Sequence, residues 1–390
     1  MNSIVFIRKA MHWRRILKST FWLTVCLAFL SSCHSKTGTA EKFVINKGVN
    51  LSHWLSQDFG WEPKYTYIKE SDIKFLDSLG FDHVRIPIDE QEIWDEQGKF
   101  IEPAVKHLLA CLDWCLKYDL RAIVDLHIIR SHHFNAENEG GHNTLWTDTT
   151  AQQHFVNLWI ELSKILSKYP TSHVAYELLN EAVAPTADDW NQLFNKALKA
   201  VRQLEPQRVI VVGANMWQTV QNVPLLKLPE NDTNLIISFH FYSPLMLTHY
   251  KASWTPLKYF NGTVSYPGYI ISPTDLKNYS DTASEAVRNM VQELAEPYNK
   301  ERIHAMIKPA IEFAQNKKLP LYCGEFGCLP TVPREARLAY YRDLISIFKE
   351  EGIAYANWEY KGDFGIYFFD NVKLKSLEPD TALIQILLGH

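Results

Sequence analysis

The chain has 390 residues, of which 46% are hydrophobic and 22% are charged, and its formal net charge at pH 7 is −4. This composition is that of a globular protein with a large apolar core, and the lack of a basic excess argues against a nucleic-acid partner. The length alone would suggest two domains, but α/β barrels commonly run this long as one domain.

The N-terminal segment is predicted to lie outside the fold. Several lysines and arginines precede an apolar run over Phe21–Leu30, which is too short for a comfortable membrane span and fits the apolar region of a signal peptide. The sequence Leu-Ser-Ser-Cys, ending at Cys33, resembles a bacterial lipobox, and this resemblance implies cleavage before Cys33 and lipidation of its thiol. An ordinary signal peptide that happens to contain a cysteine is the alternative.

We therefore expect a lipoprotein signal peptide at residues 1–32 and a flexible, lipid-anchored tether at residues 33–42. Such an anchor would hold the protein on the bacterial outer membrane. The residues after Cys33 are not acidic, which favours the periplasmic side over the cell surface. The four cysteines beyond the tether show neither disulfide nor zinc-site spacing, and we expect buried free thiols.

Beyond the tether, short apolar runs alternate with helical patterns. The runs are rich in Val, Ile, Phe and Tyr and show little polar–apolar alternation, as expected for strands of a parallel sheet buried on both faces. The predicted strands are Phe43–Leu51, His83–Ile88, Ala122–Ile128, Val174–Leu179, Val209–Ala214, Leu235–Tyr242, Leu319–Gly324 and Ile353–Trp358. Apolar residues at helical spacing fill the intervals, for example Val105, Leu108 and Leu112.

Eight such units predict an α/β fold, a (β/α)8 TIM barrel that forms a single domain over residues 43–390. A doubly wound sheet is the competing architecture, but it more often has a Gly-rich phosphate turn after its first strand. The connection Ser243–Arg302 is unusually long, and we expect it to wall a cleft because long barrel insertions are commonly functional. Pro309, within the helical stretch Ile303–Asn316, predicts a kink or a helix start there.

Polar side chains gather where the predicted strands end, which is where barrel enzymes carry their active sites. One such residue is weak evidence, because a Glu after a strand is commonly a helix-start acid and a lone His is commonly a core residue. Two Glu residues three strands apart, with Arg, His, Asn, Tyr and Trp at other strand ends, are hard to explain by packing alone. In chain order these residues are Arg85, Asp125, His127, Asn180, Glu181, His240, Tyr242, Glu325 and Trp358.

Two facing carboxyl groups are what glycoside hydrolysis needs, one protonated to release the leaving oxygen and one ionised to attack the sugar. Arg85 and Tyr242 are expected to donate hydrogen bonds to Glu325 and to keep it ionised. Glu181, with fewer donors, is expected to keep its proton near neutral pH. Asn180 would bind the sugar 2-hydroxyl, and Trp358 would form an apolar floor under the sugar.

This order of Arg, His, Asn-Glu, His-x-Tyr, Glu and Trp resembles glycoside hydrolase family 5, the cellulase-type retaining glycosidases. The resemblance implies that Glu181 is the acid/base and Glu325 the nucleophile, with a covalent intermediate and with no metal or cofactor. The segment after strand six resembles endoglucanases of this family, which implies His249 and Trp254 as further sugar contacts. The expected protein is a monomeric endo-β-1,4-glucanase acting on a β-linked glucan, and β-mannanase or exo-acting β-glucosidase remain alternatives.

The residues after His127 depart from the family pattern. Ile128 and Ile129 stand where many members have a second sugar-contacting His or Asn, and a His pair follows at His132 and His133. The sugar contacts of this segment therefore stay open.

Two interpretations from other classes compete with the glycosidase. A metal-dependent barrel hydrolase lacks support from an HxH on strand one or an HExxH motif. Its ligands would be Asp125, His127, His132, His133 and His240. A non-catalytic glycan-binding barrel would be expected to lack one essential Glu, and both are present. Three tryptophans after strand ends could either stack on sugars or pack in the core: Trp54, Trp146 and Trp217.

Overall fold

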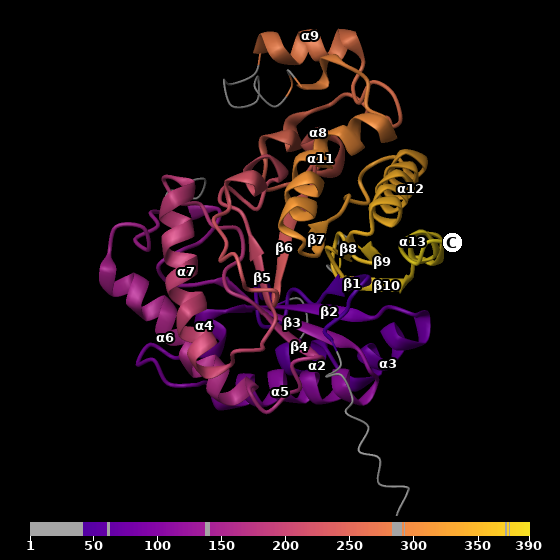
Figure 1. The fold of residues 1–390 in the computed structure, drawn as a ribbon. Helices are drawn as coiled ribbons and strands as arrows, with labels where there is room; N and C mark the ends of the chain where they lie inside the picture. Colours follow the sequence, from indigo (N-terminus) through magenta and orange to yellow (C-terminus); the bar gives the residue numbers. More distant parts are fainter. Residues whose placement is uncertain are drawn as a thin grey trace, which may run out of the picture. The chain divides into compact units, whose positions relative to one another are not determined.

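The expected strands close into one barrel in the computed structural model, which describes residues 42–60, 63–136, 141–282, 291, 293–370, 373 and 375–390 (Figure 1). Each strand pairs in parallel with the next along the chain, and β1 closes the barrel against β8. The strands are β1 Lys47–Asn50, β2 His83–Asp89, β3 Arg121–Ile128, β4 Val174–Glu177, β5 Ile210–Gly213, β6 Leu235–Phe241, β7 Leu321–Phe326 and β8 Ala354–Asn357. The (β/α)8 barrel is confirmed, and the doubly wound alternative is wrong.

Residues Phe43–His390 form one compact unit. The predicted signal peptide, the lipidated Cys33 and the tether up to residue 41 lie outside the described residues. No helix in the described ranges combines the length and apolar character needed to span a bilayer.

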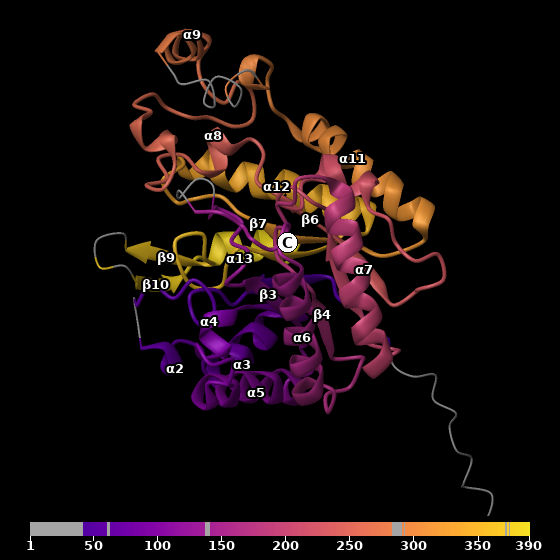
Figure 2. The same cartoon turned by 90° about the vertical axis from the view of Figure 1, so that its left-hand side faces the viewer.

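The helices cover the outer side of the strands (Figures 1 and 2). The longer ones are α3 Glu70–Leu79, α5 Glu102–Lys117, α6 Thr149–Leu166, α7 Ala187–Leu204, α11 Lys300–Lys317 and α12 Arg334–Glu351, and α2 Lys64–Tyr67, α4 Glu90–Ile93 and α13 Thr381–Leu387 are short. Local sequence explains where they begin: Thr186 and Asp189 form a reciprocal capping box at the start of α7. Packing then fixes them, as where Trp159 of α6 stacks on Tyr176 of β4 with 5.3 Å between ring centroids.

The connection between β6 and β7 is a folded insertion. Its apolar side chains join the main core of the barrel. It contains α8 Leu245–Thr248, α9 Pro273–Thr282 and the 3-10 turns η3 Pro256–Tyr259 and η4 Glu293–Ala295. The helix α11 begins at Lys300, two residues before the predicted end of the insertion, and Pro309 lies inside this helix and does not start it.

The extent of β7 decides where its acidic residue stands. The sequence predicts a strand end at Gly324, but β7 continues to Phe326 and therefore includes Glu325. In the parallel register, Glu325 pairs with His240 of β6. Neighbouring strands thus bring these two side chains to the same end of the barrel.

Other connections differ from a simple alternation of strands and α-helices. A 3-10 helix, η2 Val220–Leu225, follows β5. An antiparallel hairpin of β9 Tyr367–Asp370 and β10 Lys375–Pro379 follows β8. The sequence does not predict this hairpin. The four cysteines beyond the tether are buried and free, as expected.

Candidate active site

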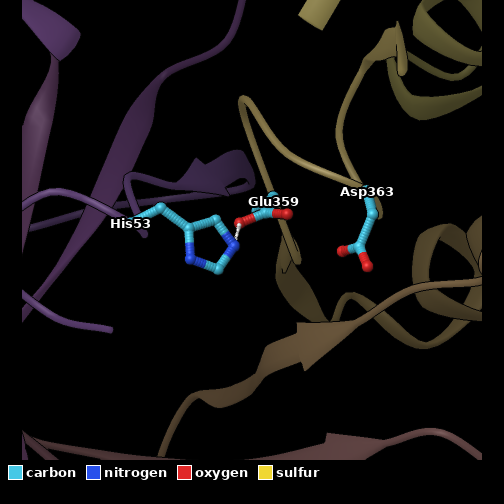
Figure 3. Close-up of side chains that lie close together, drawn as sticks. All are labelled: His53, Glu359 and Asp363. Carbon is cyan, nitrogen blue, oxygen red and sulfur yellow. Dashed lines mark ion pairs between the residues drawn. The ribbon is translucent and has the colours of Figure 1, made fainter. Parts of the chain in front are cut away.

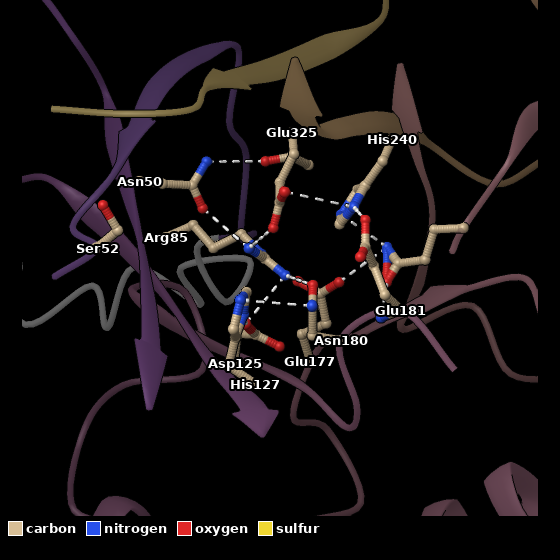
Figure 4. A network of polar contacts seen from close by, with 12 residues as sticks. Asn50, Ser52, Arg85, Asp125, His127, Glu177, Asn180, Glu181, His240 and Glu325 are labelled. Atoms are coloured by element: carbon tan, nitrogen blue, oxygen red, sulfur yellow. Dashed lines mark hydrogen bonds and ion pairs between the residues drawn. The ribbon is translucent and has the colours of Figure 1, made fainter. Parts of the chain in front are cut away.

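Glu181 and Glu325 meet where the barrel strands end (Figure 4). Glu325 belongs to β7, and Glu181 follows β4, which ends at Glu177. His240 Nδ1 lies 2.8 Å from Glu181 Oε1 and 3.6 Å from Glu325 Oε2. One carboxyl oxygen of Glu181 lies within 4.8 Å of one carboxyl oxygen of Glu325. This separation fits the roughly 5–5.5 Å between carboxyl groups of retaining glycosidases and not the roughly 6.5–9.5 Å of inverting ones.

A fully buried guanidinium, that of Arg85, organises the site. Its Nη1 donates to Glu325 Oε1 at 2.7 Å, as expected from the sequence, and its Nε donates to Glu177 Oε2 at 2.6 Å. Its Nη2 lies 3.0 Å from Asp125 Oδ2 and donates to Asn180 Oδ1 at 2.8 Å. Because an unpaired buried charge is costly, these bonds fix the guanidinium and hold the Glu325 carboxylate against it.

The two carboxyl groups of the site differ in their surroundings. Burial raises the pKa of Glu181 well above its usual value, and the charge of Glu325 raises it further. Burial also raises the pKa of Glu325, but Arg85 and His127 oppose this shift. The pair therefore holds its proton on Glu181, and Glu325 is the more acidic group.

His240 is uncharged because burial, helped by Arg85, lowers its pKa well below the usual value. Gln218 Nε2 donates to His240 Nε2 at 3.1 Å, so the ring proton is on Nδ1 and is donated to Glu181. The side-chain oxygen of Gln218 also accepts from the backbone N of Glu181 at 3.3 Å. Glu181 itself has a φ of 41°, a left-handed conformation that is uncommon outside glycine. These contacts fix both the backbone and the carboxyl of Glu181.

Aromatic side chains form the surroundings of the carboxyl pair. Trp358 stacks on the ring of His127, with 5.5 Å between centroids and 10° between planes. His127 Nδ1 lies 2.7 Å from Asp125 Oδ2, which orients the imidazole. Tyr242 donates its hydroxyl to Glu325 Oε2 at 3.1 Å. The structure therefore brings these predicted residues to the carboxyl groups.

His249 and Trp254 lie at different depths in the insertion. His249 packs on Tyr242 with 5.2 Å between ring centroids, and burial lowers its pKa to about 4. Trp254 is 55% exposed, and its ring centroid lies 6.2 Å from that of His249 and 6.4 Å from that of Phe364. His249 supports Tyr242 from behind, whereas Trp254 presents an indole to solvent.

The three other tryptophans differ in burial. Trp54 is fully buried and donates from Nε1 to His107, so it is a core residue and not a sugar platform. Trp146 and Trp217 are partly buried, and Trp217 donates to the carbonyl oxygen of Phe134. Partial exposure keeps these two available for contact with a ligand.

The ligand set expected for a metal-dependent hydrolase does not converge in the described part of the chain. Asp125 is already paired with Arg85 and His127. His132 accepts on Nε2 from the backbone N of Val183 at 3.1 Å. The side chains that this alternative needs are therefore engaged in separate interactions.

Three residues of the network are absent from the candidates drawn from the sequence: Asn50, Glu177 and Gln218. Asn50 Oδ1 accepts from Arg85 Nη1 at 2.9 Å, and Gln218 Nε2 donates to Glu177 Oε1 at 3.1 Å. Asn50 and Glu177 could have been found as polar residues inside apolar strand runs. Gln218 lies in a turn and carries no such signal.

A closed parallel barrel with two buried carboxyl groups within 4.8 Å, one of them held by a guanidinium, is the construction of a retaining glycoside hydrolase. Comparison with known families agrees with this class. The profile of the cellulase family, glycosyl hydrolase family 5, matches residues 39–363. The chain belongs to this family and is a glycoside hydrolase.

Individual relatives cover most of the chain. Endoglucanase C of Acetivibrio thermocellus is 36% identical over 327 residues, which are 82% of this chain and 92% of that protein. Cellodextrinase A of Ruminococcus flavefaciens is 29% identical over 313 residues, covering 80% and 84%. A solved structure named endoglucanase has a TM-score of 0.68 at 25% identity, with 89% of this chain and 97% of that chain covered.

Proposed function

We propose that the chain is an endo-β-1,4-glucanase that cleaves β-linked glucan with retention of the anomeric configuration. The observation that carries the mechanism is the short distance between the Glu181 and Glu325 carboxyls, with Arg85 bonded to the latter. The names of the relatives support the substrate class, since the 36% identical protein is an endoglucanase.

In the first step, the Glu325 carboxylate attacks the anomeric carbon of the bound sugar. Glu181 gives its proton to the glycosidic oxygen, and the bond between that oxygen and the anomeric carbon breaks. Arg85 and Tyr242 position the attacking carboxylate through their hydrogen bonds. The products are a glycosyl ester on Glu325 and a released chain end.

In the second step, Glu181 is ionised and accepts a proton from water. The water oxygen attacks the anomeric carbon and displaces the Glu325 carboxylate. Two successive inversions give net retention. The Nδ1–H of His240 donates to Glu181 and stabilises its charged form between the steps.

We assign the neighbouring side chains to sugar binding. Asn180 is held by Arg85 through its Oδ1, and its amide nitrogen, which lies 3.5 Å from His127 Nε2, keeps a second N–H to donate to a 2-hydroxyl. Trp358, stacked on His127, supplies the flat apolar surface under the sugar. The exposed Trp254 would contact a more distant sugar of the chain.

The Glu325→Ala variant tests the assignment of the nucleophile. Its hydrolysis of an activated β-glucoside should be abolished, and azide should restore turnover by occupying the vacated space. A single displacement by azide gives an α-glycosyl azide, which nuclear magnetic resonance identifies. A β-glycosyl azide from this variant would show that Glu325 is not the nucleophile.

Product chromatography with purified polysaccharides tests the substrate. An endoglucanase should reduce the viscosity of soluble β-1,4-glucan rapidly and release mixed oligosaccharides. Preference for short cellodextrins would indicate a cellodextrinase, in keeping with the 29% identical relative. Release of glucose alone would indicate an exo-acting β-glucosidase, and preferential cleavage of mannan would indicate a β-mannanase.

We also propose that Cys33 carries a lipid that holds a monomeric enzyme on the bacterial outer membrane, facing the periplasm. The lipobox-like sequence before Cys33 supports this location. The Cys33→Ala variant should move activity from the membrane to the soluble fraction, and protease added to intact cells should leave the anchored enzyme uncut. Light scattering of the variant tests the monomer.

A further inference from the structure

A second cluster of one imidazole and two carboxyl groups shares no residue with the reacting pair (Figure 3). His53 comes from the segment after β1, and Glu359 and Asp363 come from the segment after β8. One donor atom from each residue lies within 4.8 Å of the other two. His53 Nε2 is 2.8 Å from Glu359 Oε2. The cluster therefore joins the first and last strands of the barrel.

Within the described part of the chain, the two acidic groups of this cluster outnumber the positively charged side chains that lie next to them. Glu359 is fully buried, and besides His53 its carboxylate accepts from the hydroxyl of Ser52 and the backbone N of Phe364, which are neutral donors. Among the described residues, no Lys or Arg forms an ion pair with Glu359 or Asp363. A charged His53 can balance one carboxylate and leaves the other without a counter-charge.

Protons supply the missing positive charge when no other cation is bound. Burial and, to a lesser extent, the charge of Glu359 together raise the pKa of Asp363 to about 7. Burial lowers the pKa of His53, but the contact with Glu359 outweighs it and the pKa is raised. Both residues therefore bind protons more tightly than usual, and a divalent cation would displace these protons.

We propose that His53, Glu359 and Asp363 bind a divalent first-row transition-metal ion through Nε2 of the imidazole and one oxygen of each carboxylate. Two carboxylates and a neutral imidazole would leave the occupied site electrically neutral, and water would complete the coordination. A nitrogen among three protein ligands favours Zn²⁺ or Mn²⁺ over Ca²⁺, which prefers six to eight oxygens.

The geometry is close to what a metal needs. Donor atoms bound to one Zn²⁺ lie roughly 3.3 Å apart, so the present separation of up to 4.8 Å requires the partly exposed Asp363 to move by about 1.5 Å or less. Gly362 has a φ of 127°, and a Cβ there would lie 2.0 Å from Glu359 Oε1. His53 is itself held in the left-handed region, with a φ of 56°. A glycine at position 362 thus leaves room for the Glu359 carboxylate, and the backbone conformation of His53 directs its ring towards this carboxylate.

Titration calorimetry of the full chain, first stripped with a chelator, tests the site with Zn²⁺ as the probe. We expect one Zn²⁺ per chain with release of protons, and tighter binding at pH 8 than at pH 6, because protons compete for Asp363 and His53 at the lower pH. Asp363→Asn and His53→Ala should each weaken binding by about 10-fold or more. Ca²⁺ should bind more weakly than Zn²⁺.

The matched control is Glu181→Gln, which makes the same carboxyl-to-amide change in the other cluster of a His and two acids. It should leave the Zn²⁺ affinity unchanged. His53→Ala leaves Glu359 buried without its partner and is expected to destabilise the fold, whereas Asp363 is partly exposed and its variant should keep the wild-type circular dichroism spectrum. Wild-type affinity in Asp363→Asn, loss of binding in Glu181→Gln, or no stoichiometric binding by the wild type would each overturn the proposal.

Discussion

Two clusters of one His and two acidic residues lie at the strand ends of this barrel, and they differ in one neighbour. In the reacting pair, Arg85 donates to Glu325, and the central His240 is neutral. In the second cluster, no guanidinium or ammonium group of the described residues pairs with the acids, and the contact with Glu359 raises the pKa of His53. The pKa values of the two histidines are therefore shifted in opposite directions.

This comparison indicates that a permanent buried charge, and not the acidic residues alone, decides which carboxyl group of a pair is ionised and which keeps a proton. Arg85 stabilises the ionised form of Glu325 and leaves the remaining proton on Glu181. Without such a charge, the second cluster collects protons that a metal ion can replace. The first arrangement suits acid–base chemistry and the second suits cation binding.

Removal of the proton donor should have the largest effect. Glu181→Ala should lower kcat on glucan by about 10³-fold, because a sugar leaving group needs protonation. The loss should be much smaller on dinitrophenyl glycosides, whose leaving group departs without a proton. Steady-state kinetics on both substrates gives the comparison, and an equal loss on both would mean that Glu181 is not the acid.

Replacing the guanidinium by an ammonium group should shift the pH profile. In Arg85→Lys, kcat/KM should fall by about 10²-fold, and its acidic limb should move to higher pH by about one unit. The sign follows because Arg85 lowers the pKa of Glu325, and a lysine ammonium cannot reproduce the bonds of the guanidinium to Glu325 and its neighbours, so the carboxylate protonates at a higher pH.

For the wild type, the pH dependence of kcat/KM should be bell-shaped, and its alkaline limb should reflect loss of the proton from Glu181. Tyr242→Phe removes the other donor to Glu325 and should shift the acidic limb in the same direction by less. An acidic limb that stays in place in both variants would exclude Glu325 as the group that must be ionised.

In the second cluster, the ionised form of Asp363 should destabilise the fold, whereas Arg85 stabilises the ionised form of Glu325. The pKa of Asp363 is raised to about 7 in the folded, metal-free chain, so this residue takes up protons on folding between about pH 4 and pH 7. Its contribution is therefore most favourable at low pH and is lost as the pH rises through 7.

Asp363→Asn should remove this dependence. In the presence of chelator, the variant should be more stable than the wild type at pH 8 by about 1–2 kcal/mol, a value reduced for partial exposure, and nearly equal to it at pH 4. Urea unfolding at both pH values measures the difference. Parallel pH dependence in the two proteins would show that Asp363 ionises normally.

The smallest effect is expected at Trp254, which contacts one residue beside each of the two clusters. Its ring contacts His249, which packs on Tyr242, and Phe364, which follows Asp363. Trp254→Ala should raise KM for long cellodextrins by about 5-fold, equivalent to about 1 kcal/mol of stacking, and leave short substrates unaffected. Tyr259→Ala, at another exposed aromatic of the insertion, is the control and should leave both unchanged.

The barrel and most of the proposed site could be predicted because they follow from local patterns. Apolar runs marked all eight strands, and the polar residues that end them included Glu181 and Glu325. In a parallel barrel all strand ends of one kind face the same rim, so these side chains had to converge whatever the details of the loops.

The rest depends on contacts that no local pattern encodes. Gln218 lies in a turn yet fixes the tautomer of His240 and the backbone of Glu181. Trp54 follows a strand end like the other tryptophans, but the packing of the neighbouring helices buries it. His53 and Glu359 meet because β1 closes the barrel against β8.

The sequence by itself determined the order of the strands and that Glu181 and Glu325 stand near their carboxyl ends, since both follow from the spacing of polar and apolar side chains. Only the tertiary structure decided which of these acids keeps a proton. That outcome depends on burial and on charges such as Arg85, which are brought to each carboxyl group from distant parts of the chain.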